Sequence, residues 1–137
     1  MDPQSDPLSY RQRMSDLQAR TKQRALRIVR LCANLGGKPE ARVIRGQLLR
    51  SAMSFAANYR AVCRARSRKE FVAKLGVTIE ELDESQFWIE FATDARLIRQ
   101  KRVGALRAEL EELLAILNAS RATARKRLGE SGHSSNR

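Results

Sequence analysis

The chain has no proline after Pro39, a single histidine and few aromatic residues. Proline interrupts a helix because it lacks a backbone donor and its ring clashes with the preceding turn. No such residue interrupts a helix beyond Pro39. The one histidine, His133, lies in the C-terminal segment GESGHSSNR, which we expect to be disordered. A histidine-based catalytic triad or zinc site is therefore not expected.

Long apolar runs are also missing. No stretch approaches the roughly 20 apolar residues that a membrane-spanning helix needs. The N-terminal segment MDPQSDPLSYRQR lacks the apolar core of a signal peptide. Cys32 and Cys63 both fall within apolar helical patterns, where cysteine behaves as a small hydrophobe. We therefore expect a reduced, cytoplasmic protein without a membrane segment.

Acidic residues are outnumbered by basic ones. The sequence holds 27 Lys and Arg against 15 Asp and Glu, for a formal net charge of +12. Arginine is the commoner base, and its planar guanidinium group suits phosphates and carboxylates. A protein this basic attracts polyanions, of which nucleic acid is the commonest in the cytosol. A charged, soluble surface without such a partner is the alternative.

Apolar residues recur at helical spacing along four segments, and no convincing strand pattern is present. We predict an all-α, antiparallel up-down four-helix bundle over residues 10–128. The expected helices span residues 10–35, 40–65, 67–96 and 102–128. A disordered lead-in is expected over residues 1–9 and a disordered tail over residues 129–137.

Local signals mark the predicted helix ends. The pair Gly36-Gly37 suits the end of the first helix, and Pro39 suits the first turn of the second. Ser67 and Glu70 form a capping-box pattern, in which each side chain binds a free backbone N–H of the other residue. This pattern predicts that the third helix begins at Ser67.

The segment Gly46–Tyr59, GQLLRSAMSFAANY, carries one charge, Arg50. One face of this helix is bulky and comprises Ile44, Leu48, Ala52, Phe55, Ala56, Tyr59, Val62 and Cys63. The opposite face is a stripe of small residues around Arg50, formed by Gly46, Ser54, Ala57 and Ala61. An alanine-rich solvent face is one interpretation, since alanine is a strong helix former. We favour burial against a helix of the same or another subunit, because a solvent face in this chain should carry more charges.

The predicted helix over residues 67–96 also has two apolar strips. The core strip comprises Phe71, Leu75, Ile79, Leu82 and Ile89, and the second strip comprises Val77, Trp88, Phe91 and Ala95. Two apolar strips on one helix imply two sets of neighbours. Together with the small-residue stripe, they predict a homo-oligomer.

Charges separate along the chain. Residues 42–74 include nine bases and one acid, whereas residues 80–94 include six acids and no base. If these helices form an antiparallel hairpin that turns near residue 66, Arg50 lies opposite Asp83, next to Glu84. On the helical wheel Glu84 falls within the second apolar strip. We therefore predict a structural ion pair between Arg50 and Glu84, buried or nearly so.

A basic cluster gathers at the predicted turn between the second and third helices. Its members are Arg60, Arg64, Arg66, Arg68 and Lys69. A solvated turn is one interpretation, and a phosphate-binding rim repeated around an oligomer is the other. Few aromatic residues are interleaved with the cluster, so base stacking is not supported. Binding would be directed at the backbone, weakly sequence-specific and steeply salt-dependent.

Catalytic constellations are scarce, so we expect neither an enzyme nor a cofactor. Ser51 and Ser54 lie within a helix, without a strained turn to expose a nucleophile. The acids Glu80, Glu81, Asp83 and Glu84 could hold a metal in a bundle, but the di-metal pattern also requires histidine. We therefore predict no metal site.

The runs QLLRSAMSFAANYRAVCRARSRKEF and AKLGVTIEELDESQFWIE resemble the bacterial four-helix bundle protein family. Its founding members are encoded in intervening sequences of large-subunit ribosomal RNA genes. The resemblance covers about Leu17 to Arg127, and Arg50, Asn58 and Glu84 match family motif positions. It implies four antiparallel helices per subunit, assembled into pentameric rings, and no enzymatic activity.

A related branch, the accessory variability determinant proteins of retroelements, comprises basic pentamers that bind nucleic acid and a reverse transcriptase. With the charge, this favours a homopentamer that binds RNA or DNA, with a nucleic-acid enzyme as a further possible partner. An oligomeric scaffold or adaptor that binds an acidic protein is the alternative. Binding of RNA or DNA that is lost as salt rises would separate the two.

Overall fold

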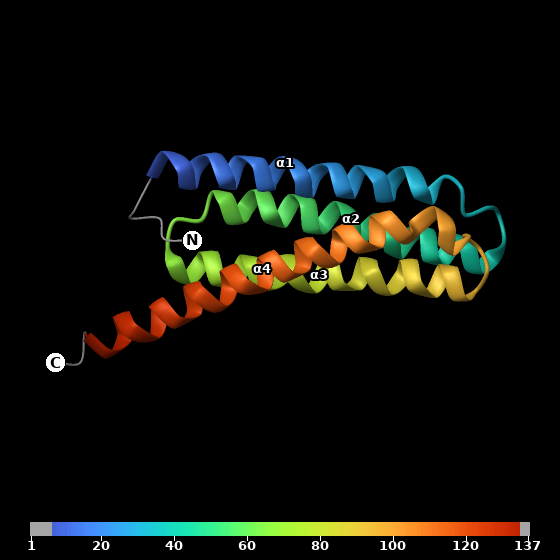
Figure 1. Cartoon of the computed structure of the whole chain (residues 1–137). Coiled ribbons are helices and arrows are strands. Elements are labelled where there is room, and N and C mark those ends of the chain that lie inside the picture. The colour runs from blue at the N-terminus through green and yellow to red at the C-terminus, as the bar shows by residue number, and fades with distance from the viewer. Residues whose placement is uncertain (1–6, 135–137) are drawn as a thin grey trace.

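The computed structural model describes residues 7–134, with side chains over residues 9–130, and contains four α-helices and no strand in that range. α1 spans Pro7–Cys32, α2 spans Pro39–Cys63, α3 spans Arg68–Asp94 and α4 spans Gln100–Ser134. Successive helices run in opposite directions (Figure 1). The prediction of an all-α fold with four helices is confirmed.

Helix extends into both of the segments that were predicted to be disordered. α1 begins at Pro7, inside the predicted lead-in, and α4 continues through Gly129 to Ser134, inside the predicted disordered tail. Each glycine in a helix costs about 1 kcal/mol relative to alanine, which Gly129 and Gly132 do not make prohibitive, and no proline follows them. The predictions for residues 1–6 and 135–137 lie outside the described residues.

The turn between α1 and α2 is held by an arginine that the sequence analysis did not single out. α1 ends at Cys32, three residues earlier than predicted, and Gly36 adopts the left-handed backbone that favours glycine, with φ +84°. The Arg45 Nε atom donates to the Cys32 carbonyl at 3.1 Å, and the same guanidinium donates to the Gly36 carbonyl. Arg45 therefore joins the last carbonyl of α1 to a carbonyl of the loop that follows it.

The ends of α3 follow recognised capping patterns. The backbone N–H of Glu70 donates to the Ser67 hydroxyl at 3.0 Å, so Ser67 is the N-cap that the sequence predicts. At the other end Arg96 has φ +60°, and the N–H of Leu97 reaches back to the Ala92 carbonyl at 2.9 Å. This left-handed turn ends the helix at Asp94, two residues before the predicted end.

The core lies along the predicted bulky face of α2. Leu48, Phe55 and Tyr59 are buried there, and α2 packs against both α1 and α3. Buried hydroxyl groups also occupy this interface, where Ser51 and Ser85 form a 2.7 Å hydrogen bond. Small side chains at these positions let the two helices approach closely.

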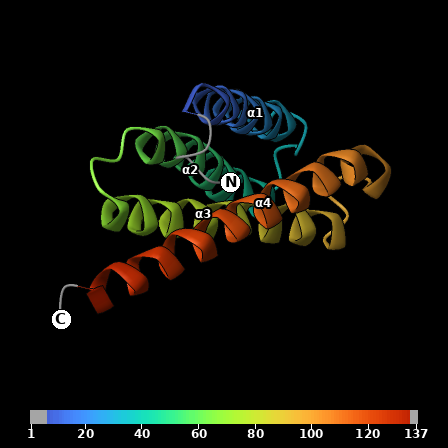
Figure 2. The same ribbon diagram turned by 60° about the vertical axis from the view of Figure 1, so that its left-hand side comes forward.

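α4 packs along α3 and diverges from the other helices towards its C-terminus (Figures 1 and 2). Glu109 binds Arg24 at 3.1 Å and also pairs with Arg27, which links α4 to the C-terminal half of α1. Beyond this contact, the last turns of α4 project past the α2–α3 turn. The bundle is therefore open where the first turns of α1 and the last turns of α4 would otherwise meet.

Candidate nucleic-acid interface

The predicted basic cluster lies at the α2–α3 turn, and all five of its members are exposed: Arg60, Arg64, Arg66, Arg68 and Lys69. Glu70 is the nearby acid, and it lies 3.9 Å from Arg66 and 3.7 Å from Lys74. Both contacts join partly exposed side chains one turn apart and are therefore weak. The cluster keeps a strong positive charge.

Two segments remote in sequence reach the same end of the bundle. The first turns of α1 and residues 116–127 of α4 line one cavity together with the α2–α3 turn. They bring further basic residues to this end. We use the name basic end for the side chains of Arg11, Arg64, Arg66, Arg68, Lys69, Arg125, Lys126 and Arg127.

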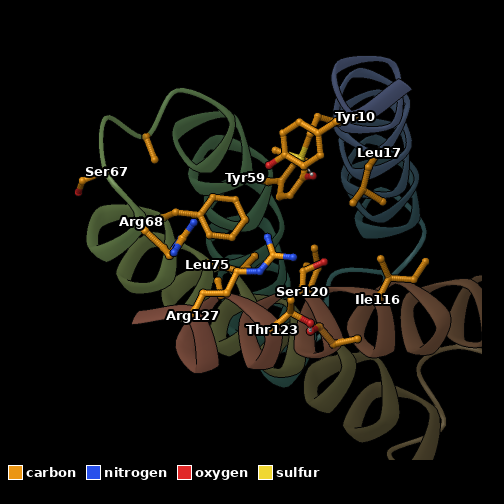
Figure 3. A pocket seen from close by; sticks show the side chains of 16 residues that line it. Tyr10, Leu17, Tyr59, Ser67, Arg68, Leu75, Ile116, Ser120, Thr123 and Arg127 are labelled. Atoms are coloured by element: carbon orange, nitrogen blue, oxygen red, sulfur yellow. Dashed lines mark hydrogen bonds between the residues drawn. The ribbon is translucent and has the colours of Figure 1, made fainter. Parts of the chain in front are cut away.

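The cavity at the basic end has a volume of about 580 Å³. Its wall includes Tyr10 and Leu17 of α1, and Ile116 and Thr123 of α4. Figure 3 shows these residues around the open space, with Arg68 and Arg127 among them. The site therefore combines apolar and aromatic walls with guanidinium groups.

Tyr59 of α2 is one of the residues that line this cavity. It is buried, and its hydroxyl lies 3.7 Å from the Met14 sulfur. Burial raises the pKa of the Tyr59 phenol well above its usual range, and burial likewise raises the pKa of the Cys63 thiol. Both groups are neutral near pH 7, so the positive potential of the basic end is not offset from within.

Arg50 lies against Glu84, as the antiparallel register predicts. It also binds Glu81 at 3.1 Å, and Trp88 donates from Nε1 to Glu84 at 3.3 Å. The hydrogen bond from Arg50 is the main reason that the pKa of Glu84 falls below its usual value. Within the single chain the pair is not buried as predicted, because the side chains of Arg50 and Glu84 are 49% and 31% exposed. The large cost of breaking a buried pair does not apply to so exposed a pair.

Much of the small-residue stripe of α2 is open to solvent, although Arg50 within it reaches the acids of α3. Gly46, Arg50 and Ala57 are exposed, and a side-chain carbon added at Gly46 would meet nothing within 4 Å. The second apolar strip of α3 is also largely open, since Val77 and Phe91 are exposed. No helix of the same chain therefore covers these two faces in the part that the structure describes.

Neither a metal site nor a membrane span appears in the described part of the chain. No group of three or more potential metal ligands is found among the residues that the structure describes. Within residues 7–134, no helix combines the length and the apolar character that crossing a bilayer requires.

The pattern of the basic cluster in the sequence does not reveal the aromatic and basic residues that α1 and α4 add to this end. Tyr10 and Arg127 are far from the cluster in sequence, so local patterning does not connect them. The up-down order of the helices, however, predicts that these residues lie near the cluster. It places the start of the first helix, the turn between the second and third, and the end of the fourth at one end of the bundle.

Comparisons with known proteins agree with this fold. The family described as 23S rRNA-intervening sequence protein matches residues 15–119. A search of curated proteins finds no match. A crystal structure of a Bacteroides thetaiotaomicron protein, described as of unknown function and from the S23 ribosomal protein family, superposes with a TM-score of 0.73 and 26% identity. The match covers 80% of this chain and 97% of that one. On the strength of the family match, this chain belongs to the 23S rRNA-intervening sequence proteins.

Proposed function

We propose that this protein is a non-enzymatic homo-oligomer that binds RNA or DNA through the basic end, without strong sequence specificity. The observation that carries the proposal is the meeting of basic side chains from α1, the α2–α3 turn and α4 at one end of the bundle. Arginine and lysine bind phosphates, and releasing the counterions around a nucleic acid supplies much of the binding energy.

Most of the acids of α3 lie away from the basic end, which supports binding of a polyanion at that end. Six acids lie within residues 80–94 of α3, and four of them fall in its middle turns: Glu80, Glu81, Asp83 and Glu84. At the α2–α3 turn the basic side chains have one acid beside them, Glu70, so a polyanion there meets little repulsion. Contacts to phosphates position a protein but carry no sequence information.

Binding should weaken steeply as salt is added. With about five phosphate contacts, the affinity for a single strand should fall roughly 100-fold between 50 and 200 mM salt. Fluorescence anisotropy with a labelled RNA of about 20 nucleotides would measure this, with a polyglutamate peptide of similar charge as the comparison. Absence of RNA binding at about 50 mM salt contradicts the proposal. Tighter binding of the peptide than of RNA would favour a scaffold for an acidic protein.

Self-association is the second part of the proposal. Most of the large apolar side chains exposed on the described surface lie on α2 and α3: Val43, Met53, Val77, Phe87 and Phe91. Phe87, Trp88 and Phe91 form an aromatic group with ring centroids 5.0 to 6.0 Å apart, in which Trp88 meets both phenylalanines edge to face. Such a patch beside a small-residue stripe favours close packing of a second subunit.

We expect gel filtration with light scattering to give a mass several times that of one chain, and five times if the ring is a pentamer. Changing Phe91 to Asp should lower that mass, because it places a charge within the exposed apolar patch. Changing Leu26, an exposed apolar residue on α1, to Asp is the matched control and should leave the mass unchanged. A clean monomer for the unchanged protein would contradict self-association.

A further inference from the structure

We propose that the nucleic acid held at the basic end is unpaired, and that one of its bases enters the cavity beside Tyr10. This inference rests on the proposed nucleic-acid binding and names the form of nucleic acid that the site accepts. The sequence alone provides no support for base stacking, and this proposal includes it.

The first observation is that Tyr10 lines two adjoining cavities. The larger has a volume of about 580 Å³ and the smaller about 460 Å³. They share Tyr10, Met14, Ala65 and Phe71 as lining residues. Both volumes lie within the range of pockets that hold small planar ligands, so a nucleobase fits either one.

The second observation is the chemistry of the walls. Tyr10, Tyr59 and Phe71 contribute aromatic rings to the larger cavity, and Leu75 and Leu117 contribute aliphatic surface. Every nucleobase has a flat face that stacks on an aromatic ring, so such a wall accepts all four bases. An exposed apolar cavity is costly to leave in contact with water, and a planar base would cover it.

The third observation is that the polar groups of the cavity are mostly hydroxyls. Ser67, Ser120 and Thr123 lie in its wall, and Thr123 donates its proton to the Ala119 carbonyl at 3.1 Å. A hydroxyl group can donate or accept by rotating. Such groups can satisfy the edge of a base without selecting one base over another, in keeping with weak sequence specificity.

The fourth observation is the position of the charges relative to the cavities. Arg68 and Arg127 line the larger cavity, and Arg11 lines the smaller one (Figure 3). A single strand that places a base between these cations keeps its phosphates next to them. A duplex offers the same phosphates but keeps its bases stacked and paired, and extracting a base costs free energy.

The aromatic residues and the cations therefore favour a ligand that has a planar apolar part, with negative charges on both sides of that part. An unpaired strand has this composition. A small amphipathic anion would use the cavity but only part of the basic end. A second copy of this chain would bring further positive charge overall, because each chain has a net charge of +12.

The test compares three ligands of equal length and label by anisotropy: an unpaired RNA, a duplex, and a strand of abasic sugar-phosphate units. We expect the unpaired RNA to bind the unchanged protein roughly 5- to 100-fold more tightly than the abasic strand, since stacking is worth about that factor per base. This comparison needs no variant, so it stands even if a substitution disturbs folding. Equal affinity for the abasic and intact strands would overturn the inference.

A substitution at Tyr10 adds a second measurement. Changing Tyr10 to Ala should weaken binding of the unpaired RNA by a similar factor and leave duplex binding nearly unchanged, while Tyr10→Phe should retain the affinity of the native protein. The dependence of affinity on salt should stay the same, because no phosphate contact is removed. Equal losses for strand and duplex in Tyr10→Ala would also overturn the inference.

The outcomes separate this inference from the proposed function. If no polyanion binds at low salt, the proposed function itself fails. If duplex, intact strand and abasic strand all bind equally and with the same salt dependence, nucleic-acid binding stands and only base insertion fails.

Discussion

Reversing two charges at the basic end, in an Arg64→Glu, Arg68→Glu variant, is expected to lower the affinity for RNA on the order of 100-fold at about 0.1 M salt. Each lost phosphate contact removes the gain from counterion release, and each new carboxylate also repels the strand. The logarithmic dependence of affinity on salt should become shallower by about 1.5 to 2. Anisotropy measured over a series of salt concentrations checks both quantities.

The matched control reverses two charges at the opposite end of the bundle. Arg99 and Arg102 lie at the α3–α4 turn, and both are exposed. The variant Arg99→Glu, Arg102→Glu changes the net charge by the same amount, and carboxylates near the start of a helix are tolerated or favourable. A loss of affinity as large as that of the first variant would mean that overall charge, and not the basic end, governs binding.

Truncating the core of α2 should have the largest effect on stability. Leu48 is fully buried on the face that packs against α1 and α3. Changing Leu48 to Ala is expected to lower the free energy of unfolding by about 2–5 kcal/mol, because it removes buried apolar surface and leaves a cavity. Urea unfolding at one protein concentration measures the change, and the slope with denaturant should stay the same.

Leu26 on α1 provides a control with the same chemistry, since its side chain is 41% exposed. Changing Leu26 to Ala should lower the free energy of unfolding by about 1 kcal/mol or less, as less apolar surface returns to water. Similar losses for Leu48→Ala and Leu26→Ala would contradict the arrangement of the core. Both changes have the same effect on helix propensity, so the difference between them reports burial.

The core was predictable because burial repeats with the helical period. Apolar spacing in α2 places Leu48, Phe55 and Tyr59 on one face, and the structure buries all three. Spacing does not reveal Ser51 and Ser85, which are fully buried although polar. Their burial depends on the partner helix, which brings one hydroxyl within hydrogen-bond distance of the other.

The candidate site was predictable only in part. The basic turn can be found from sequence because its members are neighbours along the chain. Tyr10 and Arg127 join it through the direction of α1 and α4, so their role depends on tertiary structure. For Arg50 and Glu84 the hairpin register predicts the contact but not its exposure. The exposure depends on whether another helix covers that face, and in the described chain none does.

The buried hydroxyl pair of Ser51 and Ser85 also limits how α3 can align with α2. Shifting one helix along the other by a turn would keep most of the aliphatic contacts but separate the two hydroxyls. A buried polar group without a partner costs about 1–3 kcal/mol. Ser51 could still reach the Leu48 carbonyl, 3.3 Å away in the native alignment, whereas Ser85 would need a new partner. A hairpin shifted by one turn is therefore less stable than the native one, and apolar packing alone would not produce this difference.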